Sequence, residues 1–126
     1  MKKFVIAAAA DTTLTLTMDL TNSETSNVGL HAVSADWGEA ASVAPGSGGS
    51  GASAQTNDAT WLHNFYDQSF WKTTGGDFNT SISATISING TGTYNWTSPQ
   101  LVADVQTWLD SPTLNFGWCL IGNETI

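Results

Sequence analysis

A stretch of aromatic residues in the middle of the chain is the part of this sequence best suited to chemistry. Trp61, His63, Tyr66 and Trp71 occur among Asn, Asp, Gln and Ser, and Asp77 follows in a glycine-containing turn. An exposed aromatic ring can stack on the apolar face of a sugar, and the sugar hydroxyls then hydrogen bond to nearby polar side chains. The stretch is therefore a candidate carbohydrate-binding site, with His63 and Asp77 as the polar partners.

Two carboxylates beside this stretch are candidate ligands of a structural calcium ion. Asp58 precedes the first tryptophan and Asp67 lies between the aromatic residues. Calcium prefers oxygen ligands from carboxylates and carbonyl groups, although the spacing here is not that of an EF-hand. The alternative is that both aspartates cap turns. The sequence indicates no other cofactor.

Patterns typical of catalysis do not occur in this chain. It has no HExxH, GxSxG or Cys/His motif, and its two histidines, His31 and His63, lie in different segments. A glycan-active hydrolase or lyase would need two carboxylates facing each other across a groove. Because the acidic residues are scattered, the sequence favours a module without catalytic activity over an enzyme.

Composition excludes several classes of partner. The chain has 126 residues, of which 11 are acidic and 3 basic, and its formal net charge is -8. Nucleic acids and anionic membrane surfaces require clustered Lys and Arg, so neither is an expected partner. No apolar run approaches the ~20 residues that span a bilayer, so we expect no membrane insertion. The single cysteine, Cys119, rules out an internal disulfide and is expected to be a buried thiol.

Alternating apolar and polar residues predict several β-strands, and helical spacing predicts one helix. Asn89-Gly90 predicts a hairpin between the third and fourth of these strands. Ser98 as N-cap and Pro99 at the first helical position start a short helix that extends to Leu109. Thr, Ser, Asn and Gly supply most of the polarity, as is typical of secreted β-rich modules. The pattern favours an all-β fold, an antiparallel β-sandwich, with strands over Leu14–Leu20, Val28–Val33, Ser81–Ile88, Thr93–Thr97 and Asn115–Ile121.

The domain organisation is simple. Residues 1–10 are either a remnant of a secretory signal or a first strand with Phe4 and Ile6 on one face. Residues 11–126 form a single module, with a Gly/Ser-rich loop at 44–54. Most of the six tryptophans are expected in its core, namely Trp37, Trp96, Trp108 and Trp118.

Several motifs resemble a known family. They are Asp36-Trp37-Gly38-Glu39, Ala59-Thr60-Trp61-Leu62-His63, and Val105-Gln106-Thr107-Trp108-Leu109 followed by Asn115-Phe116-Gly117. From Leu14 to Glu124 the chain resembles the DNRLRE-domain (disaggregatase-related) family of extracellular jelly-roll modules, some of which are classed as carbohydrate-binding modules. The resemblance implies a jelly roll, a secreted or cell-surface location and a polysaccharide or other cell-surface glycan as partner.

The chain also departs from that family. It looks shortened at both ends, and it has no arginine, although the motif that names the family contains one. A missing edge strand would expose unpaired backbone, which can pair with another protein chain. A structural or adhesive domain of a cell-surface protein is therefore the alternative to a carbohydrate-binding module.

Overall fold

The computed structural model describes residues 12–18, 25–45 and 51–122, which are mainly strands with one helix. The predictions for residues 1–10, for the last two residues of the Leu14–Leu20 strand, for Glu124 and for part of the 44–54 loop lie outside these ranges. The elements in chain order are β1 (Leu14–Met18), β2 (Ser26–Ala32), β3 (His63–Phe65), β4 (Ser69–Phe70), β5 (Ala84–Ile88), β6 (Gly92–Trp96), α1 (Pro99–Asp110), a 3₁₀ turn (Pro112–Leu114) and β7 (Trp118–Ile121).

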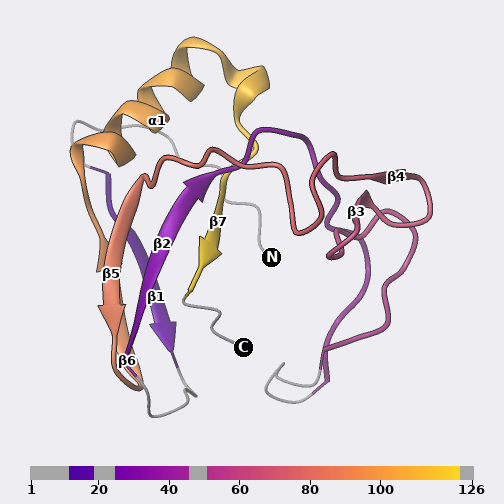
Figure 1. Ribbon diagram of the computed structural model, residues 1–126, viewed down its shortest axis with the longest axis horizontal. Helices are drawn as coiled ribbons and strands as arrows, with labels where there is room; N and C mark the ends of the chain where they lie inside the picture. The colour runs from indigo at the N-terminus through magenta and orange to yellow at the C-terminus, as the bar shows by residue number, and fades with distance from the viewer. Residues whose placement is uncertain (1–11, 19–24, 46–50, 123–126) are drawn as a thin grey trace.

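The strands form antiparallel sheets, which confirms the all-β prediction. β1 pairs with β6, the order β5-β2-β7 makes a three-stranded sheet, and β3 pairs with β4 (Figure 1). Leu14 on β1 and Trp96 on β6 share a buried cluster with Leu30 on β2. The apolar faces of the first two sheets therefore meet in one core. The order of the described strands does not by itself establish a jelly roll.

The turn at Asn89-Gly90 is present, but the predicted hairpin is wrong. β5 hydrogen bonds to β2, whereas β6 hydrogen bonds to β1, so the two arms of the turn belong to different sheets. Ile88 and Trp96 are both buried in the shared core. A flat hairpin would put β6 beside β5 in one sheet, whereas separate sheets let both apolar faces pack against each other.

Helix α1 confirms the prediction for its start. The Ser98 side chain accepts a hydrogen bond from the Leu101 amide at 2.9 Å, and Pro99 is the first helical residue. Trp108 is buried on the apolar face of α1, and its ring centroid is 4.4 Å from that of Trp118 on β7. The helix thereby covers one end of the main core.

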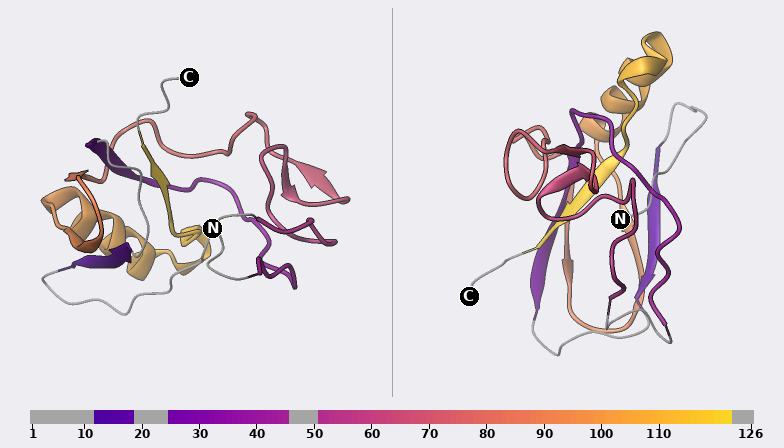
Figure 2. Two further views of the ribbon diagram at one scale, coloured as in Figure 1. Left: turned by 90° about the horizontal axis from the view of Figure 1, so that it is seen from below. Right: turned by 90° about the vertical axis from the view of Figure 1, so that its right-hand side faces the viewer.

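The opposite face of β2 and β7 is covered by a different part of the chain. Val33 and Cys119 form a second buried cluster with Trp37 and Trp71. The segment between β2 and β5 supplies these tryptophans, and it extends away from β1 and β6 (Figures 1 and 2). The two ends of this segment lie side by side at the sheet, where Val33 and Phe78 form an antiparallel bridge. This segment, residues 34–77, is called the excursion, and it carries all the predicted site residues.

Candidate functional site

Backbone hydrogen bonds at Gly38 hold together separate stretches of the excursion. The Gly38 amide donates to the Asn64 carbonyl at 2.9 Å, and the Gly38 carbonyl accepts from the Ala59 amide at 2.8 Å. A Cβ atom at Gly38 would lie 1.7 Å from the Asn57 carbonyl oxygen, so only glycine lets the two stretches of backbone approach this closely. The adjacent Trp37 is buried and donates its indole N–H to the Phe116 carbonyl at 2.8 Å. This arrangement gives the 36–39 motif a structural role.

Asp58 closes the loop that precedes the aromatic residues. Its Oδ2 accepts from the Gln55 amide at 2.7 Å and its Oδ1 from the Ala40 amide at 2.9 Å. The hydrogen bond from Gln55, followed by one from the Ser42 hydroxyl, lowers the pKa of Asp58 below its ordinary value of 3.8, against the opposing effect of desolvation. Asp58 therefore holds the loop as a carboxylate.

This carboxylate makes the stability of the fold depend on pH. Because the folded-state pKa is lowered, the stabilisation is fully present above 3.8 and is lost as the pH falls through the lowered value. We expect Asp58→Asn to lower the melting temperature at about pH 6, and the gap to wild type to close towards about pH 3. Thermal melts followed by circular dichroism measure this gap, with Asp67→Asn in the exposed turn as control. A gap that is constant across this range would contradict the assignment.

Trp71 lies in the interior of the excursion. Only 7% of its surface is exposed, and its indole N–H donates to the Thr60 carbonyl at 2.9 Å. Its amide donates to the Leu62 carbonyl at 3.1 Å, so both ends of the residue fasten the turn at Thr60. Trp71 thus supports the neighbouring aromatic residues and does not present a ring face at the surface.

Trp61 is exposed and yet fixed in place. Nearly two thirds of its surface (64%) is accessible. Its benzene ring rests against Gly75, where a Cβ atom would meet Trp61 Cη2 at 2.9 Å, and the Gly75 amide donates to the Trp61 carbonyl at 2.8 Å. Gly75 also has a φ of +96°, which favours glycine for a second reason. A rigid, exposed indole of this kind can bind a ligand without losing much conformational freedom.

A row of three rings lies on the β3–β4 hairpin. His63 and Phe70 are cross-strand partners, and their rings stack at a centroid distance of 4.3 Å. Tyr66 meets His63 edge-on at 5.2 Å. Phe70 is 69% exposed and Tyr66 37%, so the row opens to solvent. The sequence singled out Tyr66 and His63 but missed Phe70, which stands directly before the buried Trp71.

The polar residues predicted for the site are largely engaged in the loops. Asp77 accepts from the amides of Lys72 and Thr73, both at 2.9 Å, which is the turn-capping role given above as an alternative for the other aspartates. His63 Nδ1 is 3.1 Å from the Thr60 hydroxyl. The second ring nitrogen of His63, Nε2, has no hydrogen-bond partner among residues 12–18, 25–45 and 51–122, so it remains for a ligand beside the ring row.

The two proposed calcium ligands do not stand together with a third acidic, histidine or cysteine side chain. Among residues 12–18, 25–45 and 51–122 there is no group of three or more such side chains that could hold a metal ion. Both oxygens of Asp58 accept main-chain hydrogen bonds, and Asp67 lies in an exposed turn with a φ of +62°. The donor set therefore fits loop closure better than a calcium site.

Asp104, on α1, belongs to a polar network beside the main core. It accepts from the Ser83 hydroxyl at 2.5 Å, from the Trp118 indole at 2.9 Å and from the Gln100 amide group at 2.9 Å. Ser83 is buried, and its carbonyl accepts from the Ser98 hydroxyl. These contacts tie the helix to the chain before β5 and give Asp104 a structural role.

Fold and site together define a small, mainly antiparallel β module with one helix and an aromatic surface on a long excursion. Comparisons of the chain with protein-family models, with curated proteins and with solved structures found no match. The helix in the described ranges is too short and too polar to cross a membrane. The exposed aromatic surface on the excursion is thus the feature of the described residues that points to a function.

Proposed function

We propose that this protein is a non-catalytic carbohydrate-binding module that contacts polysaccharide through Trp61 and the ring row of His63, Tyr66 and Phe70. The observation that carries the proposal is the exposure of Trp61 and Phe70 on a segment whose backbone is tightly fastened. Large exposed apolar surfaces mark interaction sites, because leaving them in water is unfavourable. The jelly-roll topology, the secreted or cell-surface location and membership of the DNRLRE-domain family belong to this proposal.

The negative net charge of the protein favours a neutral glycan over an anionic one. The formal net charge is -8, and Lys72 is the one basic residue outside the first three positions. A polyuronate or sulfated glycan would be repelled at long range. The aromatic rings instead suit the uncharged faces of a neutral polysaccharide, whose hydroxyl groups can reach His63 Nε2.

Binding to a panel of soluble glycans tests this function. We expect a neutral polysaccharide to bind saturably in isothermal titration, and a polygalacturonate not to bind. Trp61→Ala and Phe70→Ala should each weaken affinity about tenfold, which corresponds to roughly 1.4 kcal/mol. Leu114→Ala is the matched control, because Leu114 is also an exposed apolar residue but lies on the 3₁₀ turn after α1. Absence of binding to every glycan would overturn the function, and unchanged affinity in both aromatic variants would overturn the site.

A second candidate function, a structural module that contacts other protein chains, rests on β7. The Val33 amide donates to the Gly117 carbonyl at 2.9 Å, so by strand alternation the main-chain groups of Trp118 and Leu120 point away from β2. No strand in the described ranges pairs with that outer edge. Sedimentation that shows a monomer at all concentrations would disfavour self-association through this edge.

A further inference from the structure

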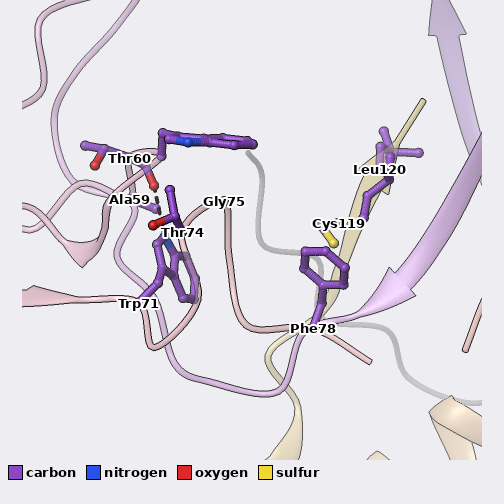
Figure 3. Close-up of a pocket in the computed structure, with 10 residues that line it drawn as sticks. Ala59, Thr60, Trp71, Thr74, Gly75, Phe78, Cys119 and Leu120 are labelled. Atoms are coloured by element: carbon purple, nitrogen blue, oxygen red, sulfur yellow. Dashed lines mark hydrogen bonds between the residues drawn. The ribbon is translucent and has the colours of Figure 1, made fainter. Parts of the chain in front are cut away.

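A pocket of about 410 Å³ lies between the excursion and β7. Figure 3 shows Trp71, Thr74 and Gly75 on one side of it and Phe78, Cys119 and Leu120 on the other. Trp61 also contributes to its wall. The volume falls within the range of about 300–1,000 Å³ that is typical of small-molecule sites. The pocket is thus large enough for a molecule with one or two rings.

The wall of the pocket is apolar and uncharged in the described residues. It comprises the residues labelled in Figure 3 together with Trp61 and Ile121, and none of these side chains is acidic or basic. The thiol of Cys119 contacts the His31 carbonyl at 3.5 Å, and burial raises its pKa, so the group is uncharged at neutral pH. A charged ligand would lose its hydration without gaining an ionic partner.

Few polar groups are left for a ligand. The Thr60 hydroxyl contacts His63 Nδ1 and accepts from the amides of Leu62 and His63. Thr74 is exposed, and its side chain lies at the wall of the pocket (Figure 3). A sugar placed inside would bury several hydroxyl groups with too few hydrogen-bond partners, which is unfavourable. The pocket therefore differs in chemistry from the surface proposed to bind polysaccharide.

We propose that this pocket binds a small, uncharged and mainly apolar molecule that contains a ring and carries at most one hydrogen-bonding group, placed near Thr74. Trp61, Trp71 and Phe78 supply aromatic contacts for the ring, and Leu120 and Ile121 supply aliphatic contacts. This is a second binding site: it shares Trp61 with the proposed polysaccharide-binding surface, but the ring row of His63, Tyr66 and Phe70 is not part of its wall.

The uncharged dye N-phenyl-1-naphthylamine, which fluoresces when removed from water, is a suitable probe. We expect saturable binding of the dye to the full chain. Thr74→Phe, which fills the pocket from an exposed position, should weaken it about tenfold, whereas Thr74→Ser should leave it unchanged. Phe70→Ala should also leave it unchanged, because Phe70 is not part of the wall. A loss of dye binding in Phe70→Ala would mean that the dye reports the exposed ring row, and would overturn the proposal.

Cys119 provides an independent readout inside the pocket. It is the only cysteine of the chain, so modification by the small uncharged reagent methyl methanethiosulfonate can be followed by intact mass. Bound dye should slow this modification, with half-maximal protection at the dissociation constant measured by fluorescence. Dye binding that leaves the modification rate unchanged would overturn the proposal, as would the absence of saturable binding.

Discussion

Trp96→Ala is expected to destabilise the fold by about 3–5 kcal/mol, a large part of the 5–15 kcal/mol that a domain of this kind possesses. Trp96 is 1% exposed and lies where the sheets β1-β6 and β5-β2-β7 meet. Its indole N–H donates to the Val28 carbonyl at 2.9 Å. The substitution would leave a cavity between the sheets and remove the hydrogen bond from the indole to the Val28 carbonyl, and both effects reduce the free energy of unfolding.

Urea denaturation followed by circular dichroism measures this loss, and the chain contains its own control. Trp61→Ala removes the same side chain from a position that is 64% exposed, so we expect a change of about 0.5 kcal/mol or less. The two variants should therefore separate stability from binding: Trp96→Ala unfolds at low urea, and Trp61→Ala binds glycans weakly but unfolds near the wild-type midpoint. Equal losses of stability in both variants would show that the described core is wrong.

Gly38→Ala is expected to cost about 3 kcal/mol or more, although it adds a single methyl group. The new Cβ would lie 1.7 Å from the Asn57 carbonyl oxygen and 2.9 Å from Cδ1 of Phe65. Because the closest atom belongs to the backbone, the whole stretch would have to move away. The hydrogen bonds that join Gly38 to Asn64 and Ala59 would then be lost, and the ring row on β3 and β4 would lose its support.

Thermal melts and glycan titration should both register this change. Gly122→Ala is the matched control, since a Cβ there would meet its nearest neighbours, in Ser26 and Val28, at 3.8 and 3.9 Å. We expect Gly122→Ala to melt and bind like wild type, and Gly38→Ala to melt early and bind glycans poorly. If the two variants behave alike, the excursion does not dock through Gly38.

The longer strands and the helix could be predicted from the sequence, because their apolar residues recur often enough to show a strand or helix period. β1, β5 and β7 lie inside the predicted ranges, and β5 and β7 are shorter than expected. β2 and β6 begin before the predicted ranges, and α1 ends one residue beyond its range. β3 and β4 have three and two residues, with an irregular register between them, and so they show no usable alternation. The sequence could not predict that β6 pairs with β1, because a turn sequence specifies a bend in the chain and not the sheet that each flanking strand joins.

Phe70 and Trp71 show why the site could be predicted only in part. Neighbouring residues of an extended chain point to opposite sides, and here Trp71 points into the interior while Phe70 faces solvent. The sequence predicted Trp71 as a site residue because it lies in a polar stretch rich in aromatic residues, but the hydrogen bond from its indole to the Thr60 carbonyl holds it inside. That hydrogen bond joins residues on the two sides of a turn, so no local sequence pattern predicts it.

The closure of the excursion at its base has a consequence for how this protein can vary. Val33 bridges Phe78, and the Ser34 amide donates to the Asp77 carbonyl at 2.8 Å, so the chain leaves and re-enters the sheet through one narrow neck. Loop-closure entropy rises only slowly with length, by about 0.6 kcal/mol for each doubling. Insertions or deletions in the exposed turns beyond the neck would therefore leave the register of β2 and β5 intact, whereas replacement of the whole excursion would also remove Trp37 and Trp71 from the second buried cluster. The exposed turns are the positions suited to loop grafting and to the evolution of new specificities.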